Sequence, residues 1–396
     1  MKNELTYALI TPYSIIKSRT GGIIGRLLRL SNLELVGARM FVFSDQFVDT
    51  YSRDLRGTSS DPKLGQGWFD YIKENLSRGN RFGILPRCMV LLFRGDDARR
   101  HLKDDVIGSF TRTPVGDTLR GTYGDLVFDV WGNVDYFEPA AITAPDDQAN
   151  QRHLALFAKY AMSDGGILED QLTFPKGQNI QTSLVLLKPD NFERPSGRAG
   201  NIIDVFSRTG LFMVAAAVIS MTASQGIEFY GHLRELFVDK LKDSVKNQLR
   251  QALSTTFGFQ ISEEIYDHIA DQLKQLNAEH EFQRIVHYMT GVDLNEVTDP
   301  QQHKDISHTR CLAILYRGPD AVSKVRTWLG ATNPSEAQPG TARSEFAQDL
   351  MRNGAHASDS QENAMRERKI LGLDKESSHT CRFKQIVEDY LAGSAT

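Results

Sequence analysis

His356 is the residue whose type and setting are best suited to chemistry. It lies within the polar segment Arg352–Ser360, directly before a predicted helix. Ser358 is predicted to cap that helix, with Gln361 completing a capping box. Backbone N–H groups at a helix start can hold a phosphate, and imidazole is a competent nucleophile near neutral pH. The simpler alternative is a surface histidine beside a helix cap, since the chain contains ten histidines.

Cationic and hydroxyl side chains on both sides of this segment favour phosphate chemistry. Arg326, Thr332 and Arg343 precede His356 and could bind several phosphate oxygens. Lys188 ends a predicted apolar strand much earlier in the chain. It becomes a phosphate ligand only if the fold brings it to His356.

An internal duplication predicts the elements that must position these residues. Leu92–Ala98 matches Leu315–Ala321, and Leu9–Pro12 resembles Leu186–Pro189. The order in both copies is predicted to be strand, turn, helix, strand. The matched segments lie further apart in the second copy, so we expect an insertion there, at residues 231–280.

Residues 231–280 are predicted to be helical, because apolar residues recur at spacings of three and four. The two periodic series are Phe237, Leu241, Val245 and Leu249, and Ile265, Ile269, Leu273 and Leu276. Core packing of a helical pair is the expected role of these residues. A dedicated partner surface is the alternative.

The turn-rich segment 162–182 is predicted to join two domains. We expect a first domain at residues 1–165 and a second at residues 180–396, with the helical insertion inside the second. Two copies of one fold unit suggest an intramolecular pseudo-dimer, in which the copies pack as subunits of a homodimer would. A further homo-oligomer is possible.

Composition narrows the classes of function. The chain has 396 residues, of which 40% are hydrophobic and 24% charged, as in globular proteins. Its net charge of −4 provides no basic field for nucleic acid. The longest apolar run, Leu211–Met221, is too short to span a bilayer, and the first residues lack the pattern of a signal peptide. Three widely separated cysteines favour a reducing compartment, so we expect a cytoplasmic protein without membrane partners.

Four ordered motifs resemble those of the nucleoside diphosphate kinases. They are Lys-Pro-Asp at 188–190, Gly-x-Thr-Asn-Pro at 330–334, Pro-Gly-Thr-x-Arg at 339–343 and Arg-Asn-x-x-His-x-Ser-Asp-Ser at 352–360. The resemblance covers residues 182–372 outside the insertion, and residues 5–160 more faintly. It implies an α+β fold of two ferredoxin-like units in tandem, with antiparallel sheets and packed helices.

The resemblance also implies the reaction and its catalytic residues. A nucleoside triphosphate would phosphorylate His356, and a different diphosphate would then collect the phosphoryl group, with Mg²⁺ carried on the nucleotide. Glu367 would orient the imidazole, Ser358 would support the site, and Lys188 would contact the transferred phosphate.

Nucleotide contacts are implied for a wider set of residues. This set is Lys188, Tyr230, Arg326, Thr332, Arg343 and Asn353. The aromatic residue that stacks on the base in this family falls within Glu281–Ile285, where Phe282 is offset by one residue. The family glycine after the histidine is replaced by Ala357.

The first copy is predicted to be inactive. Thr11 stands where the second copy has its strand-end lysine. Alternative alignments place Phe137 or Asn133 opposite His356, and the second of them places Arg120 opposite the arginine of the Pro-Gly-Thr motif. A structural role in the pseudo-dimer is therefore expected, and silent nucleotide binding is the alternative.

Two other functions remain open for the whole chain. The first is a non-catalytic nucleotide-binding or regulatory assembly protein that has kept the fold. The second is phosphotransfer from His356 to a protein acceptor, with residues 231–280 as the docking surface.

Overall fold

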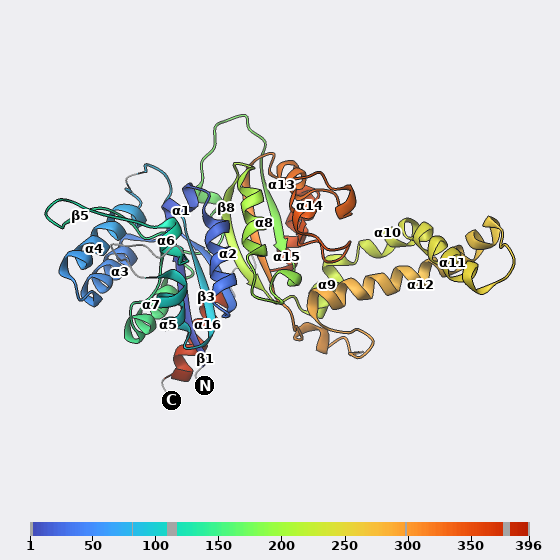
Figure 1. Ribbon diagram of the computed structural model, residues 1–396, viewed down its shortest axis with the longest axis horizontal. Helices are drawn as coiled ribbons and strands as arrows, with labels where there is room; N and C mark the ends of the chain where they lie inside the picture. Colours follow the sequence, from blue (N-terminus) through green and yellow to red (C-terminus); the bar gives the residue numbers. More distant parts are fainter. Residues whose placement is uncertain (1–2, 81, 109–116, 298, 375–380, 395–396) are drawn as a thin grey trace. The chain divides into compact units, whose positions relative to one another are not determined.

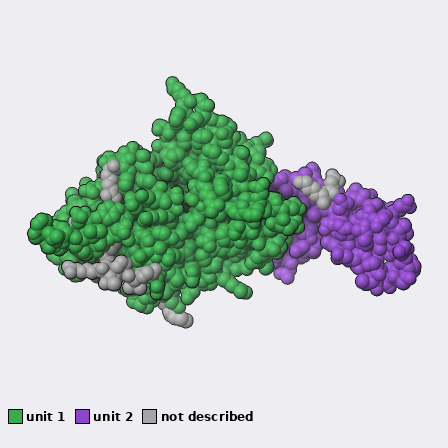
Figure 2. All heavy atoms as spheres, turned by 45° about the horizontal axis from the view of Figure 1, so that its top comes forward, with its two compact units in different colours: residues 1–219, 311–396 green, residues 220–310 purple. Residues whose placement is uncertain are grey.

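The computed structural model describes residues 3–80, 82–108, 117–297, 299–374 and 381–394. The chain forms two compact units (Figure 2). The larger unit comprises residues 1–219 and 311–396, and the smaller unit comprises residues 220–310. None of the described helices is long and apolar enough to cross a membrane.

The first half of the larger unit contains a four-stranded antiparallel sheet in the order β2-β3-β1-β6 (Figure 1). Its strands are β1 Asn3–Ile10, β2 Glu34–Phe41, β3 Cys88–Asp96 and β6 Ala141–Ile142. A separate hairpin is formed by β4 Asp125–Phe128 and β5 Val134–Glu138. The helices are α1 Pro12–Ile16, α2 Thr20–Leu30, α3 Asp45–Thr58, α4 Pro62–Leu76, α5 Ala98–Arg100, a π-helical turn His101–Ile107, α6 Leu119–Tyr123 and α7 Asp147–Tyr160.

The second half contains another four-stranded antiparallel sheet, in the order β10-β7-β9-β8. Its strands are β7 Ile180–Leu187, β8 Phe212–Ile219, β9 Cys311–Pro319 and β10 Ala355–Ala357. The helices are α8 Arg198–Ser207, α13 Ala321–Leu329, α14 Ala342–Phe346, α15 Gln361–Ile370 and α16 Arg382–Ser394, with 3₁₀ turns at Glu169–Gln171, Pro189–Asn191 and Pro334–Glu336. The predicted α+β class with antiparallel sheets is therefore confirmed.

The two sheets share the same strand order and the same irregularity. A β-bulge interrupts β2 between Leu35 and Gly37, and an equivalent bulge interrupts β8 between Met213 and Ala215. Bulges are specific features of a strand rather than random defects. Their shared position supports the internal duplication.

Strand pairing corrects the predicted alignment of the first half with His356. Leu9 pairs with Ile142, and the matching Leu186 pairs with His356. Ile142 therefore occupies the position of His356, so the predicted Phe137 and Asn133 are both wrong. The reason is that β6 follows the hairpin β4–β5, whose length the sequence matches could not reveal.

Helices α2 and α8, one from each half, lie side by side and touch through glycines (Figure 1). A Cβ added to Gly200 would lie 2.2 Å from the Gly21 carbonyl oxygen, so only glycine fits this approach. The Gly22 N–H donates to Asp204 Oδ1 at 3.2 Å. Arg87 also donates to the Met213 carbonyl at 2.6 Å. These contacts fasten the two halves within one unit.

The carboxyl-terminal helix α16 packs on β2 and α7 of the first half. The Phe383 ring lies 5.8 Å from that of Phe41, and Val387 is fully buried in the same cluster. The segment that follows the second sheet thus completes the core of the first.

The smaller unit is helical. It contains α9 Ala223–Tyr230, α10 Leu233–Lys240, α11 Lys242–Thr256, α12 Glu263–Thr290 and a 3₁₀ turn Gln302–Lys304. Helix α12 packs against the other three helices of this unit. Ion pairs also join it to α11, among them Lys242 with Asp271 at 3.3 Å.

The predicted apolar stripe on α12 is wrong at both ends. Ile265 and Leu276 are exposed, whereas Tyr266, Ala270 and Ala278 are buried. The buried face is therefore shifted around the helix. The side of α12 toward α11 carries carboxylates instead, since Glu263, Asp267 and Asp271 form ion pairs with lysines of α11.

Replacement of Gly200 by alanine tests the close approach of α2 and α8. We expect Gly200→Ala to lower the free energy of unfolding by about 1–3 kcal/mol, because the methyl group forces the helices apart. Gly57→Ala is the matched control, since a Cβ there meets nothing within 4 Å. It should be neutral or stabilising by up to about 1 kcal/mol in urea unfolding. Equal effects of the two variants would contradict the close approach.

Candidate active site

His356 lies at the centre of the short edge strand β10. The strand pairs with β7, which places His356 opposite Leu186. Gly354, with φ +78°, turns the chain into this strand in a conformation that favours glycine. The imidazole is 21% exposed, so it is partly enclosed but still reachable from solvent.

A buried carboxylate holds the imidazole from behind. His356 Nε2 lies 3.0 Å from Glu367 Oε1, and the Ser358 hydroxyl donates to Glu367 Oε2 at 2.6 Å. Burial acts to raise the pKa of the Glu367 carboxyl, but the His356 charge and the two hydrogen bonds outweigh burial and lower it. The ionised carboxylate favours the proton on Nε2, which leaves the lone pair of a neutral imidazole on Nδ1.

The helix that carries Glu367 begins two residues later than predicted. Ser360 is the N-cap of α15, and its hydroxyl accepts from the Asn363 N–H at 3.0 Å. Ser358 is therefore not the cap, and its hydroxyl is used on Glu367 instead. The sequence offered two serines of equal capping propensity, and only the fold decides between them.

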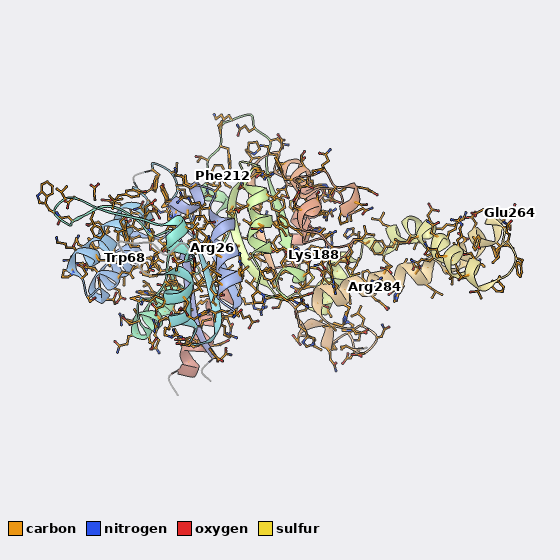
Figure 3. All side chains as sticks on the ribbon, viewed as in Figure 1. Arg26, Trp68, Lys188, Phe212, Glu264 and Arg284 are labelled. Carbon is orange, nitrogen blue, oxygen red and sulfur yellow. The ribbon has the colours of Figure 1, made fainter. Side chains whose placement is uncertain are left out.

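Lys188, labelled in Figure 3, directly follows β7. It lies beside the chain that leads into His356. Its N–H donates to the Gly354 carbonyl at 3.0 Å. Its Nζ donates to Asn353 Oδ1 at 2.7 Å and to the Met351 carbonyl at 3.0 Å. Burial, and secondly the nearby Arg343, lower the pKa of the Lys188 ammonium to about 8.

Arg343 reaches the same place from α14. One guanidinium nitrogen donates to the Gly330 carbonyl at 3.2 Å and lies 3.4 Å from Thr332 Oγ1. The other donates to the carbonyl of Ala355, the neighbour of His356, at 3.2 Å. The amide of Asn353 donates to the Thr332 carbonyl at 3.4 Å. These contacts join three predicted residues, Arg343, Thr332 and Asn353, around one loop.

The structure thus brings together most of the predicted site residues. They are His356, Glu367, Ser358, Lys188, Asn353, Thr332 and Arg343. Three elements distant in sequence supply them: the end of β7, the loop and start of α14, and the segment from β10 to α15.

Arg326 is more loosely associated with this cluster. It is exposed on α13, a helix that packs against β7 and β10. Its charge contributes, after the dominant hydrogen bond from Asn363, to lowering the pKa of Asp359. Arg326 is thus an accessible cation near the start of α15.

Tyr230 belongs to the smaller unit, where it is buried on α9 with its ring 4.9 Å from that of Phe229. Its role beside a phosphate stays a prediction. Phe282 lies in the same unit and is fully buried, with the Arg234 guanidinium 4.1 Å from its ring centroid. That face of Phe282 is therefore covered by Arg234 rather than open to a base.

The sequence did not predict a role for Asn191 at the site. Its amide donates to the Gly354 carbonyl at 2.6 Å and to the Lys188 carbonyl at 2.9 Å. It therefore fixes the turn before His356 to the end of β7. The only available signal was its place directly after the Lys-Pro-Asp motif.

The arrangement suits transfer of an anionic group to nitrogen. A partly exposed imidazole with an ionised carboxylate behind it stands beside an ammonium and a guanidinium. Such cations neutralise phosphoryl oxygens without taking part in bond making. Among the described residues, no group of three or more His, Cys, Asp or Glu side chains is arranged to hold a metal ion.

Comparison with known proteins shows a consistent likeness. A family model described as nucleoside diphosphate kinase matches residues 263–376. The nucleoside diphosphate kinase of Symbiobacterium thermophilum is 25% identical over 201 residues, covering 51% of this chain and 93% of the relative. That of Methanoregula boonei is 29% identical over 189 residues, covering 48% and 84%.

A shorter region is more similar still. The Neurospora crassa nucleoside diphosphate kinase is 54% identical over 55 residues, covering 14% of this chain and 36% of the relative. Among solved structures, the Aquifex aeolicus nucleoside diphosphate kinase is 24% identical, covers 48% of this chain and 94% of that chain, and has a TM-score of 0.31.

The environment of Lys188 can be tested by titration of the protein. With ¹³C-labelled lysine, we expect the Lys188 Cε resonance to report a pKa of about 8. The ammonium therefore carries its charge at pH 7 and loses it as the pH rises through 8. Absence of the signal in Lys188→Arg identifies it. A Lys188 titration at the ordinary value of 10.5 would contradict the buried site.

Proposed function

We propose that the chain is a nucleoside diphosphate kinase, which transfers the γ-phosphoryl group of a nucleoside triphosphate to a nucleoside diphosphate; the match of residues 263–376 to that family's model and the similarity to its curated members support the proposal. One observation carries the proposal: Glu367 and Ser358 form a hydrogen-bonded set behind His356, next to Lys188 and Arg343.

The first step is attack of the His356 imidazole on the γ-phosphorus. Glu367 engages Nε2, so the new N–P bond forms at Nδ1 while the bond to the β-phosphate oxygen breaks. The nucleoside diphosphate leaves with the electron pair of that bond. Attack by the terminal oxygen of another diphosphate reverses the step and frees His356, which gives ping-pong kinetics.

Stabilisation of charge is assigned to the surrounding side chains. Lys188 contacts the transferred phosphoryl group, and with Asn353 the ribose hydroxyls. The remaining phosphates are held by Arg326, Thr332 and Arg343, and a contact of Tyr230 with the transferred phosphate stays a prediction from the family resemblance. Mg²⁺ arrives as part of the nucleotide and neutralises charge on its phosphates. Catalysis is then mainly positioning and electrostatic stabilisation.

We also infer that the first half of the larger unit is a degenerate copy of the catalytic half, packed on it as a pseudo-dimer partner. Arg120 donates to the Gly108 and Ala141 carbonyls, as Arg343 does to those of Gly330 and Ala355. Ile142 stands in the position of His356, so this copy lacks a histidine at the position of the nucleophile.

The corresponding site of the first half is filled by its own side chains. Glu138, fully buried, accepts hydrogen bonds from Tyr71 at 2.9 Å and from Thr11 at 3.2 Å. The Arg120 guanidinium lies 5.5 Å from the Trp68 ring. A nucleotide would have to displace these buried contacts, which favours a structural role for this half. We keep the expectation of a cytoplasmic location.

Labelling with γ-³²P-ATP tests the proposed activity. We expect acid-labile label on the wild type, its transfer to an added diphosphate, and its loss in His356→Ala, because the nucleophile is removed. His101→Ala is the matched control, since this histidine of the first half lies outside the proposed site, and it should retain the label. Absence of label on the wild type would support a binding protein, and label that reaches only protein acceptors would support protein phosphotransfer. Either result contradicts the proposal.

Binding stoichiometry tests the inference about the first half. Titration calorimetry of His356→Ala with Mg²⁺-ADP is expected to give one site per chain, because the corresponding site of the first half is occupied by Glu138 and Trp68. Arg343→Ala should weaken that site, whereas Arg120→Ala, the equivalent change in the first half, should leave its affinity within about twofold. Two sites per chain would overturn the inference.

A further inference from the structure

A buried ion pair connects the segment between the two sheets to the helix that carries Glu367. Glu169 lies in the 3₁₀ turn Glu169–Gln171, after the first sheet and before β7. Its two carboxylate oxygens accept from the two terminal nitrogens of Arg368, at 3.1 and 2.8 Å. Both residues are only 8% exposed. A bidentate pair of this kind fixes direction as well as distance.

Arg368 is the residue next to Glu367 on α15. Successive helical residues point about 100° apart, so these two side chains hold two different faces of one helix. Glu367 faces His356, and Arg368 faces the inter-sheet segment. The Arg368 Nε also donates to the Leu373 carbonyl at 3.1 Å, beyond the end of the helix. A rotation of α15 that moved Glu367 would therefore also break the contacts of Arg368.

The carboxylate of Glu169 is itself fixed to the sheet. The hydroxyl of Thr182, on β7, donates to Glu169, and Arg317, on β9, donates to that hydroxyl at 3.0 Å. Burial acts to raise the pKa of the Glu169 carboxyl, but the bonds from Arg368 and Thr182 outweigh burial and lower it. The anion that holds Arg368 is thus present at neutral pH and tied to the two central strands.

The segment around Glu169 is also attached to both sheets. The Leu168 N–H donates to the Val214 carbonyl of β8 at 2.8 Å. Upstream, Asp164 accepts from both the N–H and the hydroxyl of Ser44, at 2.8 and 2.7 Å. Glu169 is therefore held in place by the first half as well as by the second.

We propose that Glu169 is a positioning residue for phosphoryl transfer, which acts through Arg368 to set the rotation of α15 and hence the place of Glu367 behind His356. The proposal rests on the proposed kinase function for its kinetic part. It gives the inter-sheet segment a part in catalysis although none of the proposed nucleotide ligands lies in that segment.

The main experiment measures single-turnover phosphorylation of His356 by Mg²⁺-ATP in Glu169→Gln, which keeps the side-chain size and removes the charge. We expect the rate to fall by about tenfold to a hundredfold, because small misplacements of catalytic groups cause losses of this size. The Kd for Mg²⁺-ADP should stay within about twofold, because no phosphate ligand is changed. Glu362→Gln, an exposed carboxylate on the same helix, is the matched control and should keep the wild-type rate.

A double-mutant cycle separates positioning from general stability. In a Glu367→Gln background, the added Glu169→Gln change should alter the rate by less than about twofold, because the carboxylate that it positions is already gone. An unchanged rate in Glu169→Gln overturns the proposal, as does an equal loss in both backgrounds. If Glu169→Gln fails to fold, Arg368→Lys keeps the charge but loses the forked pair, and it should show a smaller loss with the same non-additivity.

A readout independent of activity keeps the two proposals distinguishable. In ¹⁵N spectra of histidine-labelled protein, Glu169→Gln should move the His356 ring signals toward those of Glu367→Gln. Unmoved signals overturn the positioning role even if the kinase is active. If the wild type takes no phosphoryl group, the kinase proposal fails, and the ring signals alone then decide whether Glu169 positions His356.

Discussion

The hydrogen bond between the Glu367 carboxylate and His356 Nε2 is the contact on which the site depends. An imidazole has two ring nitrogens, and its use as a nucleophile requires that one of them keep its lone pair. The buried carboxylate, shared with the Ser358 hydroxyl, favours the proton on Nε2 and so leaves the lone pair on Nδ1. The cations around the loop, Lys188 and Arg343, can then bind an anionic group at one defined position beside the imidazole.

The rest of the molecule fixes the positions of the two residues that form this hydrogen bond. His356 is placed by the pairing of β10 with β7, and Glu367 by the rotation of α15. The first half contacts this half through the helix pair α2 and α8, and its core includes residues of α16. If the first half is the degenerate copy that we propose, its role is that of a rigid partner, which agrees with the dense packing of protein interiors.

The sequence predicted the composition of the site better than its connections. Motif order was sufficient for His356, Lys188 and Arg343, because each lies within one of the four ordered motifs. The fold class followed from the same motifs. Pairs distant in sequence were not predictable: Glu169 and Arg368 are 199 positions apart, and each looks like an ordinary surface charge. Alignment of the first half failed at β6 because strand register, not residue similarity, fixes which residue faces which.

The most direct test of this account is to find which ring nitrogen carries the phosphoryl group. Protein with ¹⁵N-labelled histidine would be phosphorylated with a nucleoside triphosphate, and the ³¹P–¹⁵N coupling measured at alkaline pH, where phosphohistidine is stable. The account predicts phosphorus on Nδ1 of His356, because Glu367 retains Nε2. Phosphorus on Nε2 would show that the carboxylate does not hold the ring as described, and would contradict the central claim.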